Sequence, residues 1–163
     1  GVYTLVDSLK FLPTNTFLIC VGGSQQYLRD FENYVKDSGY ASRIKIVPHL
    51  PKKELLKYIE ISDVLVLPNS AKDKMSLYTS PIKLFEYMAS KRPIVAANID
   101  SVEEVLINNK DAYLFIADDP KDLAIQINKA LMNDCSDMVD SAAKKSRLYS
   151  WDKRAKDISE AIK

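Results

Sequence analysis

Short runs of consecutive apolar residues alternate with amphipathic segments along most of this chain. A short continuous apolar run is typical of a strand that is buried on both faces. Runs of this kind lie at residues 17–21, 64–67, 93–97 and 112–116, and residues 44–47, which include Lys45, are a further strand candidate. Between the runs, apolar residues recur three and four positions apart, which predicts helices. The predicted helices lie at residues 27–38, 51–59, 80–89, 101–108 and 119–131, and two more follow, the second beginning at Ser150.

Buried strands that alternate with helices form a parallel sheet that is covered by helices on both faces. The pattern therefore predicts an α/β protein with a doubly wound, Rossmann-like parallel sheet in three layers, α/β/α. The 163 residues fit one domain. Ligands of such sheets bind beyond the carboxyl ends of the strands. The loops expected to form the site are residues 22–25, 48–51, 69–80 and 97–101.

Composition narrows the possible functions. The chain has 23 basic and 22 acidic residues and a formal charge of +1, which argues against a nucleic-acid binder held by basic charge. One histidine and two cysteines are too few for a usual zinc site, so we expect no metal.

No apolar run approaches the roughly 20 residues that span a bilayer, and no signal peptide opens the chain. We expect a cytoplasmic protein and, since the first residue is Gly1, a piece of a longer chain.

The segment at residues 80–89 carries the most informative polar side chains. Ser80 is expected to cap a helix whose first residue is Pro81, and the free N–H groups of a helix N-terminus favour phosphate. Lys83 lies in the first turn, where the helix dipole disfavours a cation unless an anion is bound. Glu86 shares its face and can accept hydrogen bonds from two adjacent ribose hydroxyls. The alternative is a solvated Lys83–Glu86 pair with no ligand.

The same segment resembles part of a known protein family. Ser-Pro-Ile-Lys-Leu-Phe-Glu-Tyr-Met-Ala at residues 80–89, followed by Pro-Ile-Val-Ala at residues 93–96, resembles the nucleotide-sugar-binding domain of the family 4 retaining glycosyltransferases. These are the group 1 enzymes of the GT-B fold. The resemblance extends to residues 17–23, to residues 44–64 and to Ser150-Trp151. It implies one half of a GT-B fold, in which residues 1–163 form a single C-terminal, donor-binding domain.

The resemblance implies roles for the helical segment. Glu86 matches the second of two glutamates that the family separates by seven residues, and this glutamate binds the donor ribose. Tyr78 stands where the first would lie, so the usual contact to the donor sugar is absent from this position. Ser80, Pro81, Ile82 and Lys83 are then substrate-binding residues, with Lys83 near the diphosphate.

Two other loops are candidate parts of the same site. In the resembled family, the loop that holds His49 and Leu50 borders the nucleobase, mainly through backbone groups. For His49 the alternative is an exposed loop histidine with no ligand. Gly22 and Gly23 follow the first apolar run, and they either contact phosphate or form a tight turn that leads to a helix capped by Ser24.

The leading hypothesis is thus a glycosyltransferase domain that binds a nucleoside-diphosphate sugar, with uridine diphosphate as the expected nucleotide. Transfer would be retaining, to a glycan, lipid or other acceptor, and would need no cofactor. The partner would be an acceptor-binding N-terminal domain of the same chain, which would also make any contact with the inner face of a membrane. Alone, this piece is expected to be inactive, and no catalytic residue is assigned. The competing hypothesis, favoured by Tyr78, is a degenerate module that binds a nucleotide or a partner without catalysis.

Overall fold

The computed structural model describes residues 1–72 and 82–162. The strands are β1 (Leu18–Val21), β2 (Ile44–Val47), β3 (Leu65–Leu67), β4 (Ile94–Asn98) and β5 (Tyr113–Ile116). The α-helices are α1 (Val2–Ser8), α2 (Gln25–Asp37), α3 (Lys52–Ile61), α4 (Ile82–Ala89), α5 (Asp100–Glu103), α6 (Pro120–Met132), α7 (Ser136–Ser146) and α8 (Trp151–Ala161). Short 3-10 helices lie at Leu9–Phe11, Ala41–Arg43 and Arg147–Tyr149.

The strands are parallel, as the apolar runs predict, but they form two sheets. β1 pairs with β2, while β3, β4 and β5 form the second sheet. No strand pairing joins β1 to β3 within the described ranges. A cavity of about 650 Å³ lies between their facing edges, where Ile19, Val21, Val64 and Val66 contribute to its lining. The fold is therefore built from a β1–β2 half and a β3–β5 half.

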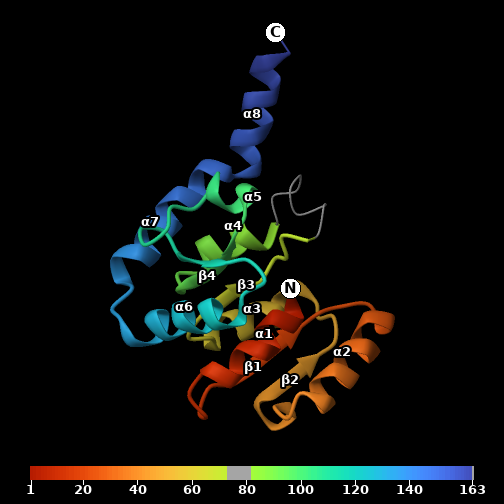
Figure 1. The fold of residues 1–163 in the computed structure, drawn as a ribbon. Coiled ribbons are helices and arrows are strands. Elements are labelled where there is room, and N and C mark those ends of the chain that lie inside the picture. Colours follow the sequence, from red (N-terminus) through yellow and green to blue (C-terminus); the bar gives the residue numbers. More distant parts are fainter. Residues whose placement is uncertain (73–81, 163) are drawn as a thin grey trace.

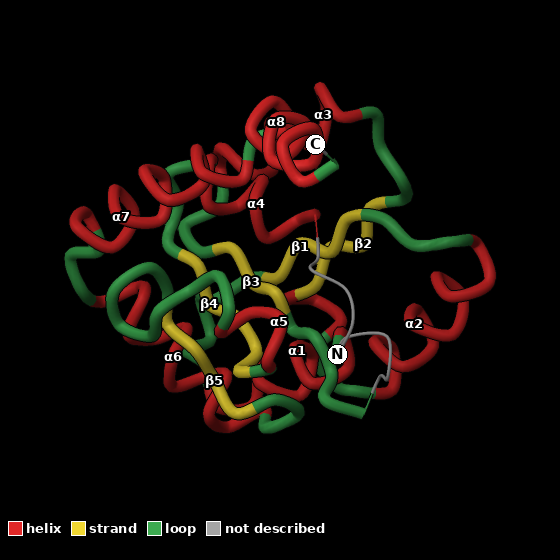
Figure 2. Tube along the Cα trace, turned by 90° about the horizontal axis from the view of Figure 1, so that it is seen from above, coloured by secondary structure: helices red, strands yellow, loops and turns green. Residues whose placement is uncertain are grey.

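Helices cover both faces of the strands. Figure 2 shows α4 and α7 on one side of the strands and α1 and α6 on the other. α1 packs against α6, and α4 packs against α7. This arrangement confirms the predicted α/β/α layers. α8 projects away from the rest of the molecule (Figure 1), and no described helix is long and apolar enough to cross a membrane.

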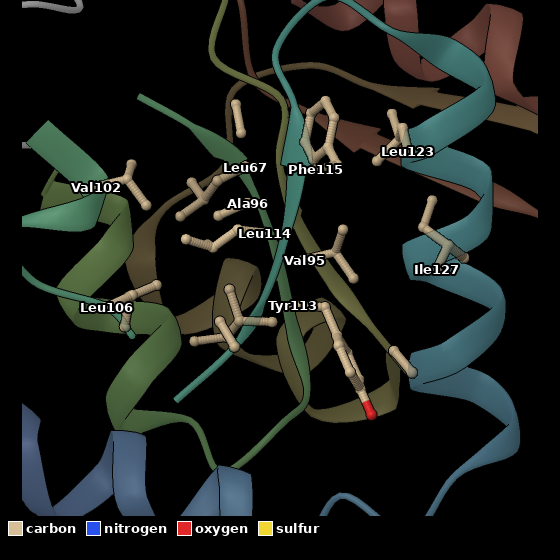
Figure 3. Packing of buried hydrophobic residues seen from close by; sticks show 14 of the residues in the cluster. Leu67, Val95, Ala96, Val102, Leu106, Tyr113, Leu114, Phe115, Leu123 and Ile127 are labelled. Carbon is tan, nitrogen blue, oxygen red and sulfur yellow. The ribbon is translucent and has the colours of Figure 1, made fainter. Parts of the chain in front are cut away.

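The main core surrounds β4, which is buried on both faces. Val95 and Ala96 have no exposed surface. Figure 3 shows Val95 and Phe115 on the side of α6, where Leu123 lies, and Ala96 on the side of Leu106. Successive residues of a strand point to opposite faces, so apolar residues are needed at all four buried positions, Ile94 to Ala97, and only the last residue of β4, Asn98, is exposed. This explains its continuous apolar run.

One predicted helix is shorter in the structure. The helix predicted at residues 101–108 ends at Glu103. The Asp111 carboxylate accepts the Ile107 N–H (3.0 Å), which a longer helix would donate to the Glu103 carbonyl. Such local hydrogen bonds compete with helix formation.

The N-terminal helix α1 was not predicted. Its short apolar pattern becomes clear only once Leu5 and Val6 are seen buried. The start of α8 is confirmed, because the Ser150 hydroxyl caps it by accepting the Lys153 N–H (3.2 Å). Asp119 likewise caps α6.

Candidate functional site

The glycine turn follows β1 at the carboxyl edge of its sheet. Gly22 and Gly23 have φ angles of 108° and 104°, which residues with a side chain rarely adopt. The Gly22 N–H donates to the Val47 carbonyl of β2 (3.0 Å). Ser24 then stands at the N-cap of α2, without a side-chain hydrogen bond. The tight-turn interpretation thus accounts for both glycines, and contact with a phosphate stays a prediction.

The second predicted loop follows β2 at the same edge. His49 is exposed and Leu50 is half-buried. Pro51 is the N-cap of α3, so the helix begins one residue later than predicted, at Lys52. The loop is short and lies beyond the carboxyl end of β2, and its Pro51 carbonyl accepts the Glu54 N–H (2.9 Å) and the Leu55 N–H (3.1 Å) of α3.

α4 supplies the third part of the predicted site. Ser80 and Pro81 lie outside the described residues, as does Tyr78. The described helix begins at Ile82, whose side chain is exposed, as is that of Lys83. Leu84 and Met88 are fully buried and fix the helix to the core. Glu86, with its side chain 32% exposed, lies on the opposite side of the helix from these anchors, because it is two residues from each of them.

Glu86 pairs with a residue that sequence reasoning missed. The Lys52 ammonium lies 3.3 Å from the Glu86 carboxylate oxygen Oε1. Between described residues, no salt bridge joins Lys83 to Glu86, so the solvated Lys83–Glu86 pair considered as an alternative is not formed. The sequence does place a lysine directly after Pro51, at the carboxyl edge of the strands, and this position could have indicated the pairing. The ion pair shows that the start of α3 and the middle of α4 lie together.

The cavity between the two sheets extends to this site. Lys83, Glu86 and Tyr87 contribute to its lining. Burial raises the pKa of the Tyr87 phenol, and the negative charge of Glu86 raises it further, so the hydroxyl is protonated at neutral pH. Most other lining residues of the cavity are apolar residues of the strand edges and helices. Polar side chains also line it elsewhere, at Asn15, Thr16, Ser62, Asp63 and Asn128, so α4 forms one of the polar parts of this cavity.

Another contact holds the beginning of the long connection between β3 and α4. The Asp118 carboxylate, in the loop before α6, accepts the Ala71 N–H (3.1 Å). Asp118 has a φ angle of 65°, a left-handed conformation that aspartate tolerates better than most residues. The connection is thus tied to the β5–α6 loop at its start.

Metal binding and cysteine nucleophilicity are two other kinds of chemistry that a site could use. Within residues 1–72 and 82–162, no group of three or more His, Cys, Asp or Glu side chains could hold a metal ion. Burial raises the pKa of the Cys20 thiol to about 11. Its sulfur is therefore protonated at neutral pH and unsuited to act as a nucleophile.

Comparisons with known proteins agree with this fold. Residues 1–148 match the family model described as "Glycosyl transferases group 1". No curated protein sequence matches the chain. Among solved structures, HepE from Anabaena, in complex with UDP, superposes with a TM-score of 0.85 at 19% identity, over 99% of this chain and 44% of that chain. Sucrose-phosphate synthase from Thermosynechococcus elongatus gives 0.83 at 20% identity, over 99% and 41%.

A glycosyltransferase from Rickettsia africae gives a TM-score of 0.80 at 17% identity, over 97% of this chain and 42% of that chain. At these identities the likeness establishes the fold. The chain spans less than half the length of each of these three proteins.

Proposed function

The chain belongs to the group 1 glycosyl transferases, and from that premise we propose that it binds the nucleoside-diphosphate part of a sugar donor at the carboxyl edge of its strands. The expected nucleotide is uridine diphosphate. One observation carries the proposal: the Lys52–Glu86 contact of 3.3 Å brings the loop after β2 and the helix after β3 to one place. Ligands of doubly wound sheets bind at such an edge.

Each part of the edge has a role in this proposal. The loop with His49 and Leu50 borders the base, and Glu86 accepts hydrogen bonds from the ribose hydroxyls. Lys83, exposed in the first turn of α4, meets the diphosphate and stabilises the charge that develops as the sugar leaves. Gly22 and Gly23 allow the backbone to approach the ligand closely, because they carry no side chain. In this scheme a lysine rather than a metal ion supplies the positive charge.

The transfer itself is proposed to need more than this chain. HepE, sucrose-phosphate synthase and the R. africae enzyme are each more than twice as long as the matched region, which supports a second domain that binds the acceptor. Transfer with retention would then take place between the two domains. This piece alone would bind the donor and turn over little or none of it.

Lys83→Ala tests the site. Uridine diphosphate offers an anion and uridine does not, so the variant should lose about 1.5–3 kcal/mol of affinity for the diphosphate, the range of a hydrogen bond to a charged group, and almost none for uridine. Titration calorimetry with both ligands gives the comparison. Lys129→Ala, an exposed lysine of α6, is the matched control. Equal losses for both ligands would mean that Lys83 does not touch phosphate.

The second candidate function is a non-catalytic binding module, and Tyr78 in place of an acid favours it. The two candidates differ in turnover. The full-length protein should release uridine diphosphate from UDP-glucose or another UDP-sugar if it is a transferase. A protein that binds uridine diphosphate but releases none from a panel of UDP-sugars, with or without acceptors, is the module.

A further inference from the structure

The Lys52–Glu86 ion pair joins the two halves of the fold. Of the salt bridges between described residues, the others lie within α3, within α8 or between Asp111 and Lys145 of the β3–β5 half. Lys52 opens the helix that follows β2, and Glu86 belongs to the helix that follows β3. Since β1 and β3 form no strand pairing in the described part of the chain, the sheet itself does not fix the distance between these two helices.

The beginning of α3 has few other anchors. Ile59 is its one buried side chain, and it lies near the far end of the helix. The Arg92 guanidinium donates to the Glu60 carbonyl at that same end. Lys52, Lys53 and Glu54 at the beginning are all exposed. Leu55, one turn into the helix, is half-buried, and between described residues the contact with Glu86 is the ion pair that joins the start of α3 to α4.

The pair leaves Glu86 able to bind a ligand. A carboxylate has two oxygens and about four acceptor positions. The Lys52 ammonium lies near Oε1, so Oε2 and the remaining lone pairs stay available to hydroxyl donors. Because Lys52 is 76% exposed, the pair adds little to folding stability, as is usual for surface ion pairs. Its effect should therefore be on position.

We propose that Lys52 is a positioning residue for nucleotide binding. It holds the Glu86 carboxylate and the loop at residues 48–51 at the spacing that one nucleoside requires, with the base on one half of the fold and the ribose on the other. This inference rests on the proposed function. It adds a residue that acts through Glu86 rather than by touching phosphate.

Lys52→Met should weaken the binding of uridine diphosphate about two- to fivefold, the effect of losing an exposed ion pair, and leave the melting temperature unchanged. Lys52→Arg, which keeps the charge, should bind like the wild type. Lys53→Met, which removes the neighbouring exposed lysine, is the matched control and should have no effect. Binding is measured by titration calorimetry with uridine diphosphate and with its 2′-deoxy analogue.

A double-mutant cycle separates positioning from direct contact. In a Glu86→Gln background, Lys52→Met should have no further effect, and Lys52→Met alone should reduce the preference for the ribo- over the deoxynucleotide. An equal loss in both backgrounds would mean that Lys52 touches the ligand itself, and tighter binding would mean that it competes with the ribose. Either result overturns the proposal, as does a loss equal to that of Lys53→Met. If the wild type binds neither nucleotide, the proposed function fails first, and this inference with it.

Discussion

The buried carboxylate of Asp111 provides a quantitative test of how the β3–β5 half is held together. Asp111 is 2% exposed. Its carboxylate accepts hydrogen bonds from the Lys145 ammonium (2.7 Å), the Ser141 hydroxyl (2.6 Å) and the Ile107 N–H (3.0 Å). The cluster ties the turn before β5 to α7. Burial alone would raise the pKa of Asp111, but the hydrogen bonds from Lys145, Ser141 and Ile107 outweigh it and hold this pKa below its usual value.

Lys145→Met is the perturbation that tests the cluster. Removing one partner of a buried ion pair costs about 3–5 kcal/mol. The Lys145 side chain is 24% exposed, so water can replace part of the lost contact, and we expect a loss of about 2–3 kcal/mol. For a chain of this length, that loss lowers the melting temperature by about 5–10 °C. Thermal and urea denaturation followed by circular dichroism measure it, with Lys144→Met, an exposed neighbour on α7, as the control.

The loss should also depend on pH. Because the pKa of Asp111 is lower in the folded chain, its contribution to stability is fully present above the unfolded pKa of about 3.9 and disappears as the pH falls through the folded value. Protonated Asp111 no longer attracts Lys145. The difference between the wild type and Lys145→Met should therefore be largest near pH 7 and shrink below about pH 4. A difference that is the same at pH 7 and pH 3, or no larger than that of Lys144→Met, would refute the reasoning.

Three further variants test local features. Glu86→Gln keeps the shape of the side chain but weakens the acceptor, so calorimetry should show a loss of affinity for uridine diphosphate that is larger than for the 2′-deoxy analogue; equal losses would reject the ribose role. Gly23→Ala should cost about 1–3 kcal/mol in urea unfolding, because φ is 104° and the new Cβ would lie 3.2 Å from Leu28 Cδ2; a loss below about 0.5 kcal/mol, the range of ordinary surface changes, would contradict the strain. Asp118→Ala removes the acceptor of the Ala71 N–H and should cost about 1 kcal/mol, whereas Asp118→Asn should cost less; equal melting temperatures of the wild type and Asp118→Ala would show that the contact contributes nothing.

The layers of the fold could be predicted because each buried strand is a continuous apolar run. Residues 64–67 and 93–97 are apolar at every position, since helices cover both faces of the second sheet. The separation of β1 from β3 could not be predicted in this way, because periodicity reports which faces are buried and not which edges are paired. α5 is shorter than its apolar pattern, and the Asp111 carboxylate bonds the Ile107 N–H that would extend it.

The positions of the candidate loops along the chain could be predicted from the sequence. The loops after β1 and β2 and the helix after β3 lie at strand ends because connectivity places them there. The partner of Glu86 was missed because an i, i+3 pairing with Lys83 is visible in the sequence, whereas the contact with Lys52 depends on tertiary packing. Tyr87 shows the same limit, since the burial that raises its pKa comes from the fold around α4.

The most direct test of the account is to map where uridine diphosphate binds. Backbone amide resonances of the chain are assigned, and their shifts are followed as uridine diphosphate is added, with uridine and inorganic phosphate as controls. The account predicts saturable shifts that cluster at residues 22–25, at residues 48–52 and along α4 from Ile82 to Glu86. Shifts confined to α7 and α8, or no shifts at millimolar uridine diphosphate, would contradict it.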